Sequence, residues 1–382
     1  MSGAVANARA LQTTLRERAS EIETARRLPA DLSAEFARAG FYRMCVPEKY
    51  GGLELPPMTT METIETLGAA DGSAAWCVFI AATSGTVLAL LPEEGAREVF
   101  SHEETLLGGV FAPRGEAHPK ERGFRVNGRW AWGSGTQNAD WVMGGCRIFE
   151  GGKPATGKDG APVARMMIAP ASEVTFHDTW YVSGLSGTGS TDFEFEDLWV
   201  PEHRAVGLGV ERPLERPLYA FPQFGLLAMG IAAVALGLAR AAIDELVDLA
   251  GTKTPAASSR ALAARQSTQT EVALAEAERR SARAFFYETI GAAWEMACAE
   301  GRIGVDERRD IRLATTHAVR ASASAVDRMY HLAGGSSVYR TSPLQRIFRD
   351  VHVTTQHMMV APSTFELTGR LLLGLDTNTS QL

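Results

Sequence analysis

The chain contains 382 residues, of which 45% are hydrophobic and 22% are charged, as in a soluble protein with two or three structural units. Its 38 basic and 45 acidic residues leave a net charge of −7, which argues against a nucleic-acid-binding surface. Four scattered cysteines form no CxxC pair, so free thiols and no metal centre are expected. The N-terminal residues contain no apolar export segment, so we expect a cytoplasmic protein.

Residues 1–112 have the pattern of a helical domain. Apolar residues recur at three- and four-residue spacing in LQTTLRERASEIETARRLP, in DLSAEFARAGFYRM and from Pro57 to Leu91. Gly40 ends one of these patterns, and Gly51-Gly52 is typical of a turn.

Residues 113–212 have the texture of a small antiparallel β unit. Short runs rich in Val, Phe, Trp and Thr are separated by Gly, Asn and Pro. Phe193 and Phe195 alternate with acidic residues, as in a half-buried strand. Asn127-Gly128 lies between two such runs and predicts a hairpin turn.

Residues 213–382 are predicted to form a helical bundle. The apolar run from Phe224 to Ala239 is shorter than the roughly 20 residues that span a bilayer and is rich in Gly and Ala, so we expect a buried helix and no membrane span. Further helical patterns cover Ser267–Ala299, which stops at Gly301, then Asp306–Ala333 and Leu344–Leu373.

Four segments carry a resemblance to a known superfamily. They are PEKYGG (residues 47–52), NGRWAWGSGTQNADW (127–141), SGLSGTGSTDFEFEDLWVPEHR (183–204) and LAGGSSVYRTSPLQRIFRDVHVTTQH (332–357). These segments resemble the acyl-CoA dehydrogenase superfamily. The resemblance implies a mainly α fold with an N-terminal helical domain, a middle antiparallel β-barrel and a C-terminal four-helix bundle, and a homotetramer.

The expected base of an acyl-CoA dehydrogenase is missing. In the commonest dehydrogenases a glutamate follows the Arg-Asp pair by eight residues, and Met358 stands there. The alternative place is the first bundle helix, and FGLLAMGIAAVALG contains no acid. Without a carboxylate, removal of an α-proton from a thioester lacks its main participant.

The chain is more similar to the two-component flavin-dependent monooxygenase branch. That resemblance implies an oxygenase component that takes reduced flavin (FADH2 or FMNH2) from a separate NAD(P)H:flavin reductase. With O2 as co-substrate it would form a C4a-hydroperoxide and hydroxylate a small aromatic substrate such as a phenol, a secosteroid, an indole or dibenzothiophene. A dehydrogenase with a displaced base, an N-oxygenase of an amino sugar and an inactive scaffold remain alternatives.

The resemblance implies two catalytic residues. His357 matches a histidine of the monooxygenase branch, where an imidazole that titrates near neutrality could deprotonate or orient a phenol or indole. Ser134 matches a serine whose hydroxyl bonds flavin N5, and Trp132 belongs to the same matching block. His352 is expected on another face of the helix and is interpreted as structural.

Further flavin contacts are implied by two glycine-rich turns and one cation. The predicted cofactor-binding residues are Gly187, Thr188, Ser190, Gly335, Ser336 and Lys253, with Arg260 as the rival of the lysine. Each glycine-rich turn is also an ordinary turn or helix cap, and a flavin phosphate needs a cation or a helix N-terminus.

Two positions are predicted to line the substrate pocket. Met358 follows the catalytic histidine, and Ser84 stands where many phenol-hydroxylating relatives carry a histidine after a G-S-x-A-W pattern. The absence of that histidine favours an indole-like or other aromatic substrate, or an amine, over a simple phenol.

Overall fold

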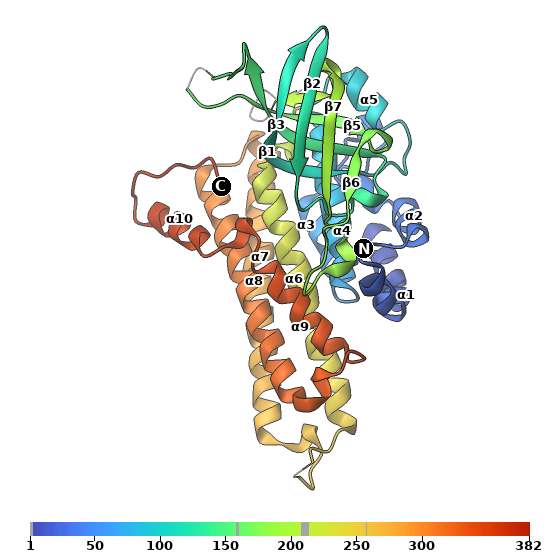
Figure 1. The fold of residues 1–382 in the computed structure, drawn as a ribbon. Coiled ribbons are helices and arrows are strands. Elements are labelled where there is room, and N and C mark those ends of the chain that lie inside the picture. Colours follow the sequence, from blue (N-terminus) through green and yellow to red (C-terminus); the bar gives the residue numbers. More distant parts are fainter. Residues whose placement is uncertain (1–2, 158–159, 208–213, 257) are drawn as a thin grey trace.

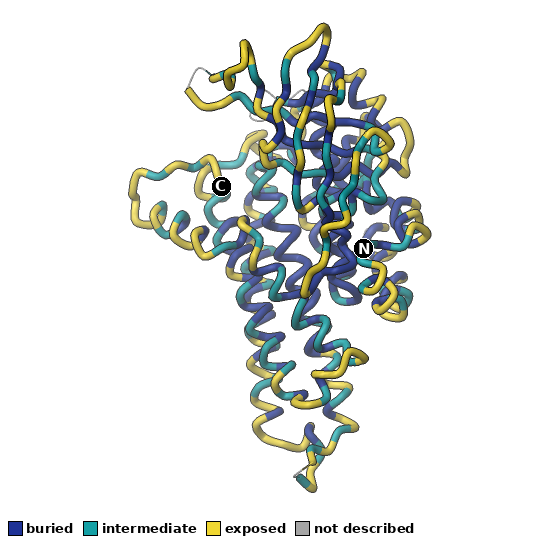
Figure 2. Tube along the Cα trace, in the orientation of Figure 1, coloured by how far each residue is buried: buried dark blue, intermediate teal, exposed yellow. Residues whose placement is uncertain are grey.

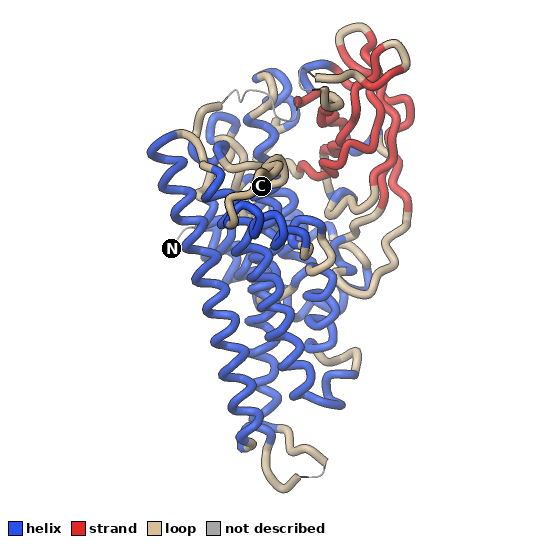
Figure 3. Tube along the Cα trace, turned by 90° about the vertical axis from the view of Figure 1, so that its left-hand side faces the viewer, coloured by secondary structure: helices blue, strands red, loops and turns tan. Residues whose placement is uncertain are grey.

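The computed structural model describes residues 3–157, 160–207, 214–256 and 258–382, and these follow the predicted order of helices, sheet and bundle (Figure 1). The sheet lies beside one end of the bundle, and the other end of the bundle extends away from the rest of the molecule (Figures 1 and 3). Only the end next to the sheet is packed on all sides, so a buried site can form there.

The first part of the chain packs against the first bundle helix. Its helices are α1 (Gly3–Ala25), α2 (Ala30–Arg38), α3 (Pro57–Gly68), α4 (Gly72–Ser84) and α5 (Glu93–Val99). Asp71 caps the N-terminus of α4, and its Oδ1 accepts a hydrogen bond of 2.9 Å from the Ala74 amide. Such a cap satisfies one of the free amides at a helix start.

The β unit is one mixed sheet. Its strands are β1 (Leu107–Lys120), β2 (Gly123–Trp130), β3 (Trp141–Glu150), β4 (Lys153–Pro154), β5 (Ala164–Pro170), β6 (Thr175–His177), β7 (Asp192–Pro201) and β8 (Ala205–Gly207). They are ordered β6-β7-β2-β1-β3-β5-β8, with β4 paired to β3. The pairs are antiparallel except β1 with β3, which is parallel, so the expectation of a purely antiparallel unit was wrong.

Two sequence predictions in this region need correction. The turn between β1 and β2 lies at Glu121-Arg122, and Asn127-Gly128 lies inside β2 at a register shift opposite β7. The Asn127 side chain accepts a hydrogen bond of 2.7 Å from the Asp197 amide at this irregularity. Strand β1 starts at Leu107, so a boundary at 112/113 would divide a strand, and the boundary at 212/213 lies outside the described residues.

The bundle consists of three long helices and a shorter one. They are α6 (Gln223–Thr252), α7 (Gln266–Glu300), α8 (Val305–Ala333) and α9 (Pro343–Thr354), followed by α10 (Ser363–Leu372). Helix α7 ends at Gly301, which has a left-handed φ of 67°, as its sequence predicts. The predicted helix over 344–373 is in fact interrupted after Thr354 by a turn that contains His357.

Helix α6 is the buried centre of the molecule. A Cβ at Gly237 would lie 2.5 Å from the Glu65 carbonyl oxygen, so only glycine lets α6 approach α3 this closely. Two helices, Gly72–Ala89 and Gln223–Thr252, have the length and hydropathy of membrane spans, and their most apolar windows are 94% and 89% buried. Figure 2 shows this burial where the bundle meets the other elements. The prediction of a buried helix is confirmed.

Candidate active site

Trp76 of α4 links the two segments that contain the predicted catalytic residues. Its Nε1 donates a hydrogen bond of 3.1 Å to Ser134 Oγ in the loop after β2. The centre of its ring lies 5.9 Å from that of His357, in the turn after α9. Ser134 and His357 are therefore neighbours of one buried indole, although they are more than 200 residues apart in the sequence.

Three buried hydroxyl groups continue from Trp76 as a chain of hydrogen bonds. Ser134 Oγ lies 2.6 Å from Ser190 Oγ, and Ser190 Oγ lies 2.7 Å from Thr188 Oγ1. Thr188 Oγ1 donates to the Leu185 carbonyl at 2.7 Å. Three of the predicted cofactor-binding residues are thus in direct contact.

The direction of this chain follows from the number of protons. Each hydroxyl has one proton, and that of Thr188 goes to the Leu185 carbonyl. Ser190 must therefore donate to Thr188, and Ser134 must donate to Ser190. Ser134 also accepts from Trp76 Nε1 and keeps one lone pair. The Ser134 hydroxyl can accept one more hydrogen bond but has no proton left to donate.

Asp350 of α9 holds the loop that supplies Thr188 and Ser190. Its Oδ1 accepts a hydrogen bond of 2.6 Å from the Leu185 amide, and Leu185 has a left-handed φ of 51°. Burial raises the pKa of Asp350 to about 7, and the nearby carboxylate of Asp71 adds to this increase. A Cβ at Gly187 would overlap Ile22 and Ser73, so this predicted cofactor residue is packed tightly against α1 and α4.

Trp132 lies beside the hydroxyl chain in a strained conformation. Its φ of 66° is left-handed, which is uncommon for a residue with a bulky side chain. Its side chain is 69% exposed, and its carbonyl accepts a hydrogen bond of 2.9 Å from the Ser134 amide. A planar ligand could stack on this exposed ring next to Ser134.

His357 caps the short turn that follows α9. Its Nδ1 accepts a hydrogen bond of 3.2 Å from the Met359 amide, so in the neutral ring the proton is on Nε2. Burial, together with the positive charge of Arg312, lowers the pKa of His357 to about 4. At neutral pH the imidazole is therefore an uncharged donor at Nε2, and the expectation that it titrates near neutrality was wrong for the free protein.

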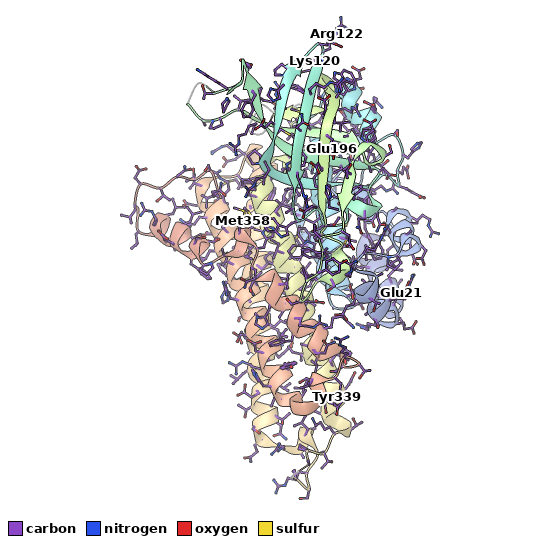
Figure 4. The ribbon with its side chains drawn as sticks, viewed as in Figure 1. Glu21, Lys120, Arg122, Glu196, Tyr339 and Met358 are labelled. Atoms are coloured by element: carbon purple, nitrogen blue, oxygen red, sulfur yellow. The ribbon has the colours of Figure 1, made fainter. Side chains whose placement is uncertain are left out.

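The two predicted pocket residues differ in burial. The Met358 side chain is 66% exposed and lies on the surface (Figure 4), whereas Met359 is buried beside Arg312. Of these two adjacent methionines, the turn after α9 therefore exposes the first and buries the second. Ser84 is buried, but it lies eight residues after Trp76, about 12 Å further along the α4 direction.

Lys253, Gly335 and Ser336 form a separate group at the far end of the bundle. Lys253 Nζ donates to Ser336 Oγ at 2.8 Å and to the Ala333 carbonyl. In α4, Gly72 packs against Leu238 of α6 and Phe79 packs against Gly230 of α6. Trp76 lies between these two contacts in the sequence. Lys253 is therefore about 28 Å further along α6 than Trp76. Within one chain, these residues do not join the Ser134 group; Tyr339 marks their end of the bundle in Figure 4.

The sequence interpretation missed four residues of the site. Asp71 and Trp76 lie in or beside the G-S-x-A-W pattern, and Asp350 completes the Arg-Asp pair, so these motifs could have indicated them. Arg312 had no such indication, because it is one of several arginines in the polar pattern of α8.

Comparisons with known proteins agree with this architecture. Residues 6–99 match the family model "Acyl-CoA dehydrogenase, N-terminal domain", and residues 229–362 match "Acyl-CoA dehydrogenase, C-terminal domain". An indole-3-acetate monooxygenase of Pseudomonas putida is 36% identical over 94% of this chain and 90% of its own length. The chain belongs to the flavin-dependent monooxygenase branch of the acyl-CoA dehydrogenase family.

Two further relatives support this assignment. The oxygenase subunit HsaA of a flavin-dependent monooxygenase from Rhodococcus jostii is 30% identical over 91% of this chain and 92% of its own. The structure of XiaF from Streptomyces, solved with FADH2 and glycerol, has a TM-score of 0.88 and 26% identity, and the match covers 98% of this chain and 95% of that one. Both the recognition and the fold predicted from the sequence are confirmed.

Asp350 predicts a pH-dependent stability. Its folded pKa of about 7 exceeds the unfolded value of about 3.9, so its contribution is complete at low pH and is lost as the pH rises to 7. Asp350→Asn keeps an oxygen for the Leu185 amide and does not titrate. Relative to this variant, the wild type should lose about 3–4 kcal/mol of unfolding free energy between pH 4 and 8, measured by urea titration. The exposed Asp248→Asn is the control; parallel curves for wild type and Asp350→Asn would contradict the prediction.

Proposed function

We propose that this protein is the oxygenase component of a two-component flavin-dependent monooxygenase. It takes reduced flavin, FADH2 or FMNH2, and O2, and adds one oxygen atom to an aromatic, indole- or phenol-like substrate. The observation that carries this proposal is the hydroxyl chain that ends at Ser134, together with Trp76, which contacts both Ser134 and His357. The identity of 36% with an indole-3-acetate monooxygenase supports it.

The residues around Ser134 fit a reduced flavin. When bound, the reduced flavin supplies the two electrons with which O2 is activated. Its N5 carries a proton, whereas N5 of the oxidised ring is an acceptor. The free lone pair of Ser134 can accept from the reduced form and offers no proton to the oxidised form. Ser134 would thereby hold the N5 proton in place and favour the reduced cofactor.

Other residues of the chain would hold the rest of the cofactor. We assign the ring to Trp132 and Ser134, and the neighbouring chain atoms to the segment of Gly187, Thr188 and Ser190, which Asp350 fixes in place. We assign the phosphate end to Lys253, Gly335 and Ser336, which lie together at the far end of the bundle. Because the two groups are about 28 Å apart along α6, they would serve one flavin only if a second copy of the chain contributed the distant group.

His357 would orient the substrate through its Nε2 proton. Accepting a proton would take place at Nδ1 and would break the hydrogen bond from the Met359 amide, so this ring is better placed to donate than to act as a base. A donor here can bind an electronegative atom of the substrate and hold the aromatic ring beside Trp76. The low pKa keeps the imidazole uncharged at the pH of the cell.

The structure offers no support for dehydrogenation of a thioester. Met358 is exposed where a carboxylate would be needed, and α6 contains no acidic residue before Asp244. The charged group that affects His357 among the described residues is a cation, Arg312. We further propose a cytoplasmic homotetramer that receives flavin by diffusion from an NAD(P)H:flavin reductase.

A direct test supplies the protein with enzymatically reduced flavin, indole-3-acetate and O2 labelled with oxygen-18. We expect a product that contains one labelled oxygen atom and depends on the reduced flavin, measured by mass spectrometry. We also expect no oxidation of acyl-CoA thioesters with an artificial electron acceptor. Acyl-CoA turnover without labelled product would overturn the proposed function.

Ser134→Ala should uncouple the reaction. Loss of one neutral hydrogen bond of about 0.5–1.5 kcal/mol should weaken reduced-flavin binding by about 2- to 12-fold and increase hydrogen peroxide release relative to product. Anaerobic fluorescence titration and a peroxide assay measure these two effects.

Ser190→Ala provides the matched comparison. It leaves the Ser134 oxygen in place but frees its proton, so the ratio of oxidised to reduced flavin affinity should rise. An unchanged ratio, with unchanged coupling in Ser134→Ala, would remove this hydroxyl chain from the flavin site.

His357 combines a structural and a functional role that two substitutions can separate. Asparagine is a good capping residue, so His357→Asn should retain the turn, whereas His357→Ala should lose about 1 kcal/mol of stability. Both variants should bind reduced flavin and lower product formation by about 10²-fold, the scale of losing substrate positioning. Product formation, flavin affinity and Tm are measured on each preparation; normal product formation by a folded His357→Asn would show that His357 acts only as a cap.

A further inference from the structure

Arg312 is a buried arginine without an acidic partner among the residues that the structure describes. It lies in α8 and is 2% exposed. Its Nη1 donates to the Met359 sulfur at 3.6 Å, a weak acceptor, and its buried Nε has no hydrogen-bond partner. Other buried or half-buried arginines of the bundle do have acidic partners: Arg279 and Arg283 pair with Glu65, and Arg328 pairs with Glu271.

An unpaired buried guanidinium is unfavourable for folding. Removing a charge from water costs several kcal/mol unless an opposite charge and hydrogen bonds compensate. Burial lowers the pKa of Arg312 to about 10, so the group remains charged at neutral pH despite this cost. A buried cation without a compensating carboxylate is suited to a ligand that brings its own anion.

Arg312 lies close to His357, the residue that we propose to orient the substrate. It contacts Met359, whose amide donates to His357 Nδ1, and its charge lowers the His357 pKa. The His357 imidazole lies beside Trp76, and the indole of Trp76 also contacts Ser134. A substrate held between these groups would place its polar end near the guanidinium and its ring near the indole.

We propose that Arg312 binds the carboxylate of an aromatic acid and so determines the substrate class. This inference rests on the proposed function, since it assigns the substrate of the same site. A guanidinium can form two parallel hydrogen bonds with a carboxylate, and Nε, which lacks a partner, is one of the donors that this geometry uses. The P. putida relative is named for an aromatic acid, indole-3-acetate, which agrees with this class.

The test compares indole-3-acetate with indole-3-acetamide, a neutral probe of nearly the same shape. Binding is measured anaerobically with reduced flavin present, so that affinity is read without turnover. A charge-assisted hydrogen bond contributes about 1.5–3 kcal/mol, so the wild type should bind the acid about 10- to 100-fold more tightly than the amide. Arg312→Gln should abolish this preference and lower affinity for the amide by less than about threefold.

Two further variants keep the test decisive. Arg312→Lys retains the charge but loses the planar fork, so it should recover part of the preference for the acid. Arg312→Met removes the buried charge and should raise the Tm, which provides a folded variant if Arg312→Gln is unstable. Arg320→Gln, the same change at a partly exposed arginine two turns along α8, is the control and should keep the preference.

Each other result has a defined meaning. If Arg312→Gln lowered the affinities for the acid and the amide equally, the role of Arg312 would be structural. If it lowered the affinity for reduced flavin and left the preference for the acid intact, Arg312 would serve the flavin. Either result would overturn the inference. A wild type that binds neither probe, or binds both equally, would overturn it as well. An Arg312-dependent preference without incorporation of labelled oxygen would support the assignment of the anion site and contradict the proposed monooxygenase reaction.

Discussion

The site depends on the burial of one indole. Trp76 can join the hydroxyl chain to His357 only because α4 is packed tightly against α6, where a Cβ at Gly230 would overlap Phe79. Asp71 fixes the start of α4 one and a half turns before Trp76, and the same carboxylate lies close enough to Asp350 to raise its pKa. The position of the Trp76 side chain thus depends on three features together: the cap at Asp71, the close contact between α4 and α6, and the loop held by Asp350.

Burial also explains the unusual acid–base properties of the site. In a poorly solvated environment the charged form of each group is disfavoured, so the pKa of Asp350 rises while those of His357 and Arg312 fall. The hydroxyl chain avoids this cost because every proton in it has an acceptor. The hydrogen-bond partners of Ser134 are therefore uncharged, whereas Arg312 beside Met359 is a buried charge.

Sequence reasoning succeeded where a local pattern determines the outcome. The end of α7 at Gly301, the end of α8 before Gly334 and the burial of α6 follow from capping and composition. It failed where distant packing decides: Asn127-Gly128 is a common turn pair, yet pairing with β7 keeps it within a strand. The order in the Ser134 chain and the lack of a partner at Arg312 depend on contacts between remote segments. The spacing of residues in the sequence does not reveal such contacts.

His357 and Arg312 are electrostatically coupled. The cation contributes to the low pKa of the imidazole, so an anion bound to Arg312 would cancel part of that effect. The His357 pKa should then rise from about 4 when an aromatic acid binds, but remain unchanged with a neutral analogue. In the proposed complex, the carboxylate of the acid would offset the unfavourable burial of the Arg312 charge.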